Sequence, residues 1–163
     1  MAILLKPGIS EEASQEVDLR VEKSVRRILA DIEERGDEAV RELSERFDDW
    51  SPDHFRLSQS EIDELIDSLP TQTIEDIQFA QAQVRGFAEE QRRTLQDLET
   101  RSLPGVTLGH RHIPINNVGC YVPGGRYPMV ASAHMSVVTA KVAGAERVVA
   151  CTPPLDRKPP AAT

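Results

Sequence analysis

Residues 117–154 read NVGCYVPGGRYPMVASAHMSVVTAKVAGAERVVACTPP, and the fold class is predicted from these residues. It predicts a strand over 118–122, a glycine turn, a helix over about 130–143 and a second strand over 147–151. Strand, helix and strand in this order form the smallest unit of a parallel sheet, and such sheets bind ligands at their strand ends. We therefore predict an α/β fold. Two strands alone do not make a stable sheet, so we expect the sheet to be truncated here: either further strands lie beyond Thr163 in a longer polypeptide, or another chain completes the sheet.

The residues before this stretch have the periodicity of helices. Apolar residues recur at three- and four-residue steps over about residues 10–35 and again after Gly36, which predicts two helices. Ser58 and Glu61 have the spacing of a capping box, so a third helix should begin there. The apolar stripe from Thr73 to Leu98 predicts a fourth, longer helix.

Pro104-Gly105 is a turn signal at which both the periodicity and the charge change. We place a domain boundary there, with a helical N-terminal arm over 1–103 and the sheet-containing domain over 104–163. The first segment carries 13 Lys or Arg and 25 Asp or Glu, and the second carries six and two. The acidic arm argues against nucleic acid as a partner. The basic second segment suits a small anionic ligand, although uneven charge on solvated faces explains it equally well.

The composition is that of a globular protein, with 39% hydrophobic and 28% charged residues. No apolar run approaches the length of a membrane span, and the N-terminus lacks the pattern of a signal peptide. We therefore expect a cytoplasmic protein with no membrane partner. Cys120 and Cys151 lie in apolar runs without a Cys-x-x-Cys spacing, which predicts small, buried hydrophobic side chains.

The glycine turn is the first candidate site. Gly124 and Gly125 lack a Cβ, so the backbone can approach a ligand closely or take a positive φ, and the amides that begin the next helix favour a phosphate or carboxylate. The turn matches neither G-x-G-x-x-G nor a P-loop, and a plain strand-to-helix turn explains it equally well. His110 and His112 can chelate a metal together, but a structural zinc site needs more ligands, which favours hydrogen-bonded or surface histidines.

Several blocks of this sequence resemble the histidinol dehydrogenase family. The most specific are V-G-C-Y-V-P-G-G at 118–125, A-K-V-A-G at 140–144 and V-V-A-C-T-P-P at 148–154, with Met135 between them. Residues 35–40 and 46–48 are similar to the family's early helices, and residues 87–91 are similar to the end of its long helix. The resemblance therefore covers nearly the whole chain.

This resemblance implies a zinc-associated, NAD-dependent oxidoreductase that takes a primary alcohol through an aldehyde to a carboxylate. It also implies a homodimer with incomplete Rossmann-like NAD-binding domains, of which residues 104–163 would be the first part. Family members are more than twice this length, so the chain resembles an N-terminal fragment. The family's zinc ligands and its acid/base Glu-His pair would then lie beyond Thr163. The fragment alone, with no catalytic or metal-binding residue, is predicted to be inactive.

Five residues are predicted to bind cofactor or substrate. Tyr121 of the Y-V-P-G-G block is the position that contacts NAD in the family, and Gly124 and Gly125 complete the predicted cofactor-binding set. Arg126 and His134 are the predicted substrate-binding residues. A guanidinium can hold a sulfonate or a cofactor phosphate by paired hydrogen bonds, and an imidazole can donate to a substrate oxygen. An exposed loop arginine and a histidine bonded to its neighbouring loop are the alternatives.

The expected substrate follows from departures from the histidinol enzymes. Arg126, Tyr127 and His134 stand where those enzymes usually have small or aliphatic residues. The chain is in this respect more similar to the sulfopropanediol dehydrogenase branch, which oxidises a dihydroxypropanesulfonate to sulfolactate. Histidinol dehydrogenase activity is one alternative function, and a non-catalytic fragment that provides only dimer contacts is another.

Overall fold

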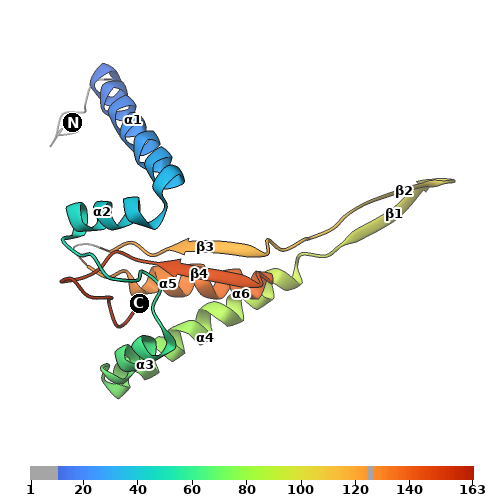
Figure 1. The fold of residues 1–163 in the computed structure, drawn as a ribbon. Coiled ribbons are helices and arrows are strands. Elements are labelled where there is room, and N and C mark those ends of the chain that lie inside the picture. The colour runs from blue at the N-terminus through green and yellow to red at the C-terminus, as the bar shows by residue number, and fades with distance from the viewer. Residues whose placement is uncertain (1–10, 125–126) are drawn as a thin grey trace, which may run out of the picture. The chain divides into compact units, whose positions relative to one another are not determined.

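The structure, a computed structural model, describes residues 11–124 and 127–163 (Figure 1). Two of the predicted site residues, Gly125 and Arg126, lie outside these ranges. Contacts within the chain divide it into two compact units, with the division between Asp53 and His54. No helix in the described ranges combines the length and the hydropathy that a membrane crossing needs.

The first unit contains two of the predicted helices. These are α1 (Glu11–Arg35) and α2 (Asp37–Asp48), which pack against each other. Gly36 joins them with φ 60°, a left-handed value that glycine adopts at little cost. Gly36 is also the N-cap of α2.

Arg35 ties the two helices of this unit together. Its Nε lies 2.8 Å from Asp31 Oδ1 on α1, and its Nη2 lies 2.7 Å from Glu42 Oε2 on α2. Hydrogen bonds from the guanidinium lower the pKa of both carboxyl groups. The turn at residue 36 is therefore braced by a pair of ionised carboxylates that share one arginine.

The second unit begins with the two other predicted helices. The capping box of α3 (Gln59–Asp67) is confirmed, since Ser58 Oγ accepts from the Glu61 N–H at 3.3 Å and the Ser58 N–H donates to Glu61 Oε2 at 2.7 Å. The next helix, α4 (Thr71–Arg93), is shorter than predicted. Its last turn closes with a 3.1 Å bond from the Thr94 N–H to the carbonyl of Gln91, and the chain then leaves the helix.

A β-hairpin follows α4, formed by β1 (Leu98–Leu103) and β2 (Val106–His110). Pro104 and Gly105 form its turn, in which Gly105 has φ 82°. The predicted domain boundary therefore falls within a hairpin. Helices α3 and α4, which the prediction assigned to an N-terminal arm, belong to the same compact unit as residues 104–163.

The predicted parallel strand pair is confirmed. Strand β3 (Asn117–Tyr121) pairs in parallel with β4 (Arg147–Cys151), in a register that places residue 117 opposite 147 and residue 121 opposite 151. The connecting helical stretch has three parts, α5 (Val130–Ala133), η1 (His134–Val138) and α6 (Thr139–Ala143). Helix α4 packs against η1 and α6, and Ala88, Val138 and Val142 form a buried cluster between them. The described residues thus show the predicted α/β fold.

Candidate functional site

Tyr121 is the last residue of β3, and its side chain is open to solvent. The neighbouring Cys120 and Val122 are buried, whereas Tyr121 is 66% exposed, as the alternation of side chains along a strand requires. Cys151 pairs with Tyr121 across the ladder and is also exposed. The prediction of a buried cysteine is therefore confirmed for Cys120 and wrong for Cys151, whose position beyond the core of a two-stranded sheet leaves it uncovered.

The loops that follow β3 and β4 pack directly on each other. The Val122 N–H donates to the Cys151 carbonyl at 2.8 Å and so extends the pairing beyond the strands. A Cβ on Gly124 would lie 2.7 Å from Pro153 Cγ and 3.1 Å from Pro153 Cδ. Gly124 is not among the described glycines with a positive φ. The glycine is therefore required by the space beside Pro153, and its part in ligand binding stays a prediction.

His134 lies on the first residue of η1 and is 7% exposed. It lines a groove of about 530 Å³, together with the strand-end residues Val122, Cys151 and Thr152. The structure thus brings Tyr121 and Gly124 to one strand edge, and it places His134 in the wall of a neighbouring groove. Arg126, the other predicted substrate-binding residue, is outside the described ranges.

The π-helical turn at η1 was not predicted from the sequence. Ser136 Oγ donates to the Ser132 carbonyl at 2.7 Å, and Thr139 Oγ1 donates to the carbonyls of Met135 and Ser136. Such hydroxyl groups compete with backbone N–H groups for the carbonyls of the preceding turn. Hydroxyl residues spaced along a helix are the signal that could have drawn attention to this turn. Single π turns are frequent at functional sites, and this one carries His134.

The two histidines near the hairpin are hydrogen-bonded. His110 Nε2 lies 3.0 Å from the Gln96 carbonyl oxygen, and His112 Nδ1 lies 3.3 Å from Asp97 Oδ1. The backbone N–H of His112 also donates to Asp97, and this bond is the main cause of the lowered pKa of that carboxyl group. Within residues 11–124 and 127–163, no three His, Cys, Asp or Glu side chains are grouped closely enough to hold a metal ion. The zinc that the resemblance implies has no complete ligand set there.

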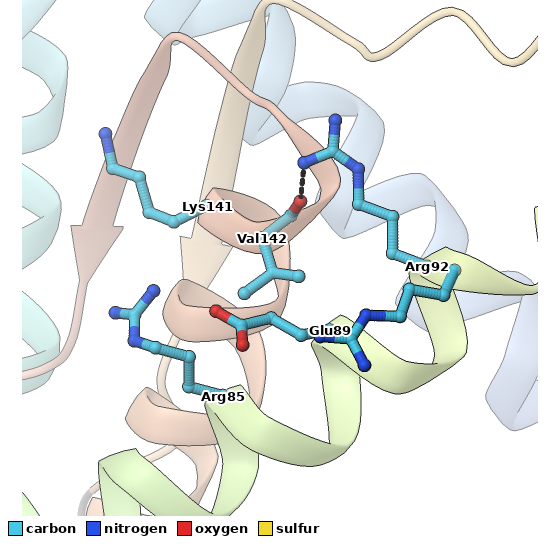
Figure 2. A pocket seen from close by; sticks show the side chains of 6 residues that line it. Arg85, Glu89, Arg92, Lys141 and Val142 are labelled. Carbon is cyan, nitrogen blue, oxygen red and sulfur yellow. Dashed lines mark hydrogen bonds between the residues drawn. The ribbon is translucent and has the colours of Figure 1, made fainter.

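A basic hollow between α4 and α6 is a feature that sequence reasoning missed. Figure 2 shows Arg85 and Glu89 projecting from α4 towards α6, which contributes Lys141. Arg92 Nη1 donates to the Val142 carbonyl at 2.5 Å and so satisfies an oxygen at the C-terminal end of α6 (Figure 2). The contact joins residues 50 positions apart in the chain, so no local pattern could have indicated it. It fixes the end of the helix that precedes β4.

The comparisons with known proteins agree with this geometry. A profile described as histidinol dehydrogenase matches residues 11–163. A histidinol dehydrogenase homolog from Shouchella clausii is 55% identical over 163 residues, which are 100% of this chain and 38% of that protein. A sulfopropanediol 3-dehydrogenase from Ruegeria pomeroyi is 46% identical over 134 residues, or 82% of this chain and 31% of that protein.

Two further proteins have more distant similarity. A histidinol dehydrogenase from Lactiplantibacillus plantarum is 36% identical over 151 residues, or 92% of this chain and 35% of that protein. The crystal structure of histidinol dehydrogenase from Elizabethkingia anophelis superposes with a TM-score of 0.74 at 27% identity, over 94% of this chain and 33% of that chain. This protein thus spans about a third of the length of the curated relatives it matches. The match over residues 11–163 and the shared fold show that the chain belongs to the histidinol dehydrogenase family.

Proposed function

We propose that this chain provides the N-terminal part of an NAD-dependent, zinc-associated oxidoreductase that converts a primary alcohol through an aldehyde to a carboxylate. Family membership over residues 11–163 carries the proposal. The exposed Tyr121 at the end of β3 supports it, because dinucleotides bind outside the carboxyl ends of parallel strands. We propose that the complete enzyme is cytoplasmic and works as a homodimer.

The described residues fit part of an NAD site. The Tyr121 ring offers an accessible apolar face and a phenolic hydroxyl, which suits contact with a cofactor ring or ribose. Bound NAD would supply the acceptor for the hydride that leaves the alcohol carbon. The part of the chain that the structure describes offers no comparable fit for zinc, so no role in metal binding is assigned to it.

We propose a sulfopropanediol-type substrate. The relative named sulfopropanediol 3-dehydrogenase is 46% identical, whereas the histidinol dehydrogenase from L. plantarum is 36% identical. Arg126 would bind the sulfonate, and His134 would contact the part of the substrate that reaches the groove. Histidinol oxidation is the second candidate, because enzymes of that name match the same region. A role in dimer contacts alone is the third.

The test uses the full-length protein encoded by the reading frame that contains these residues, supplied with zinc and NAD. We expect NAD reduction with sulfopropanediol and at least about tenfold lower kcat/KM with histidinol, which corresponds to about 1.4 kcal/mol of transition-state binding. The reverse preference would establish the histidinol alternative. The 163-residue chain by itself is the control and should not reduce NAD with either alcohol. NAD reduction by this control would show that the missing segments are not needed for catalysis.

Tyr121→Ala in that full-length protein is expected to raise the KM for NAD by up to about tenfold, because an aromatic contact contributes about 0.5–1.5 kcal/mol. Its side chain is 66% exposed, so the urea midpoint should not change. Tyr121→Phe separates the contribution of the ring from that of the hydroxyl. Phe79→Ala is the matched control, since Phe79 is 68% exposed on α4. An unchanged KM in Tyr121→Ala would remove Tyr121 from the cofactor site.

A further inference from the structure

The basic hollow between α4 and α6 gathers cations in a chain that is acidic as a whole. Its volume is about 530 Å³, and the described residues that line it are Arg85, Glu89, Arg92, Arg93, Lys141 and Val142. Four of these six residues are cationic, whereas the whole chain has a net charge of −8. A hollow in which one sign of charge dominates attracts ligands of the opposite sign.

Two of the arginines in the hollow have protein partners of different kinds. Arg93 Nη1 lies 2.5 Å from Glu90 Oε1, and this carboxylate offsets the charge of Arg93. Arg92 Nη1 instead donates to the Val142 carbonyl at 2.5 Å. A carbonyl oxygen carries no net charge, so the positive charge of Arg92 is not offset by this bond.

The other charged side chains of the hollow leave it with a net positive charge. Within residues 11–124 and 127–163, the side chains of Arg85 and Glu89 form no hydrogen bond and no ion pair. Lys141 Nζ donates to the Glu146 carbonyl at 3.3 Å, which again leaves its charge in place. The three cations Arg85, Arg92 and Lys141, with the one carboxylate of Glu89, leave two positive charges in the hollow (Figure 2).

The helix dipole accounts for only part of this charge. Cations are favoured in the last turn of a helix, which is where Arg92 and Lys141 lie. Arg85 is eight residues before the last residue of α4, a separation of more than two turns. The dipole effect is confined to the last turn, so it gives no reason for the cation at Arg85.

The packing of the two helices fixes the positions from which these side chains extend. Ala88, between Arg85 and Arg92 on α4, packs with Val138 and Val142 in the buried cluster. The bond from Arg92 to the Val142 carbonyl joins the same two helices near their C-terminal ends. The backbone of the hollow is therefore formed before any ligand binds, which lowers the free energy needed to order the site.

We propose that the basic hollow binds a small anion through a dianionic phosphate group, with Arg85, Lys141 and the remaining N–H groups of Arg92 as its donors. A phosphate group carries a charge of about −1.5 to −2 at pH 7 and offers three acceptor oxygens. This charge matches the two positive charges that the hollow leaves without a partner. Guanidinium groups bind phosphate through pairs of parallel hydrogen bonds, which favours phosphate over a singly charged carboxylate.

This site is separate from the predicted cofactor site. The hollow adjoins the C-terminal end of α6, after which the chain enters β4 at Arg147, whereas Tyr121 and Cys151 lie at the other ends of β3 and β4. The hollow also shares no lining residue with the groove of His134. The anion would therefore bind in addition to NAD, and the proposal does not depend on the proposed enzymatic activity.

The experiment titrates the 163-residue chain with inorganic phosphate at pH 8 and follows the NMR signals of the backbone amides and the arginine side chains. Sodium chloride keeps the ionic strength at about 0.1 M, so that the Debye length stays at about 10 Å throughout. We expect saturable shifts at Arg85, Arg92 and Lys141 with a Kd of about 1 mM. Shifts that do not saturate below about 20 mM phosphate would contradict the proposal.

Three single substitutions test which side chains hold the anion. Arg85→Gln should raise the Kd for phosphate by at least about tenfold, because it removes a charged hydrogen-bond donor. Glu89→Gln should lower the Kd by about threefold, because it removes the carboxylate that repels the anion. Arg101→Gln is the matched control, since Arg101 is an exposed arginine on β1 outside the hollow, and it should leave the Kd unchanged.

The opposite effects expected at Arg85 and Glu89 separate binding from folding. Both side chains are exposed, so the urea midpoint of each variant should equal that of the unchanged chain. The proposal fails if Arg85→Gln leaves the Kd unchanged, if Glu89→Gln raises it, or if Arg101→Gln raises it as much as Arg85→Gln does. Phenyl phosphate then distinguishes the source of the group. Equal Kd values for phenyl phosphate and inorganic phosphate indicate a site for free phosphate, and a lower Kd for phenyl phosphate indicates a phosphate ester.

Discussion

Gly124→Ala is expected to destabilise the second unit by about 1–3 kcal/mol, the usual cost of adding a methyl group to a packed position. The new Cβ would lie 2.7 Å from Pro153 Cγ and 3.1 Å from Pro153 Cδ. A proline ring cannot rotate away from such a contact, so the loops after β3 and β4 would have to separate. The free energy of unfolding, measured by urea denaturation of the 163-residue chain, gives the size of the effect.

The substitution Pro153→Ala provides the control for this prediction. It removes the ring atoms that the new Cβ would meet. Gly124→Ala should therefore lower the free energy of unfolding much less when Pro153 is also replaced by alanine. Gly124 does not have a positive φ, so an alanine there causes no backbone strain. Such strain therefore cannot hide the stability that Pro153→Ala restores. If the double variant is as unstable as the sum of the single variants, the glycine is required for a reason other than Pro153.

This pair of variants also separates packing from cofactor binding. In the proposed full-length enzyme, rescue of stability without rescue of the KM for NAD would show that a ligand needs the space at Gly124 as well. If both the stability and the KM for NAD are restored, packing against Pro153 is enough to explain why residue 124 is a glycine. The glycine turn drew attention to this residue in the sequence, and only the structure shows which atoms surround it.

Elements with local signals were predicted well from the sequence. The capping box at Ser58 and Glu61, the glycine between α1 and α2, and the apolar runs of β3 and β4 each involve residues close together in the chain. In such cases the hydrogen bonds that define the element are made by the residues that form the pattern. The predicted fold class follows from these elements alone.

The errors concern elements that depend on distant residues. The apolar stripe continued to Leu98, but the helix ends at Arg93, and Asp97 instead accepts hydrogen bonds from His112, 15 residues further along. The spacing of apolar residues gives no information about a hydrogen-bond partner so far away in the sequence. The turn signal at Pro104-Gly105 is confirmed by the hairpin, and its use as a domain boundary stays a prediction.

The roles of the candidate site residues stay predictions, and the structure adds the surroundings of those that it describes. Tyr121 was identified by resemblance, and its exposure follows from strand alternation once the buried neighbours are known. The burial of His134 depends on the groove wall built by α3, α4 and the strand ends, which the sequence does not bring together. His134 can therefore contact a substrate only through this groove.

Gly109→Ala is expected to have the largest effect on the hairpin. Gly109 pairs with Glu99, and a Cβ at this residue would lie 2.1 Å from the backbone oxygen of Leu98. A backbone atom of a paired strand cannot move aside without breaking the ladder. We expect the amides of β1 and β2 to lose protection from hydrogen exchange by about a hundredfold, while β3 keeps its protection.

Thr107→Ala is the matched control, because Thr107 lies on the same strand, is exposed and pairs with Arg101 without such a contact. A second readout comes from Asp97, whose pKa is lowered by the backbone N–H of His112 at the base of the hairpin. When the strands separate, this bond is lost and the pKa of Asp97 should rise towards its ordinary value in an NMR titration. If Gly109→Ala leaves both exchange and this pKa unchanged, the strands pair in a different register, because the register described here leaves no room for the methyl group.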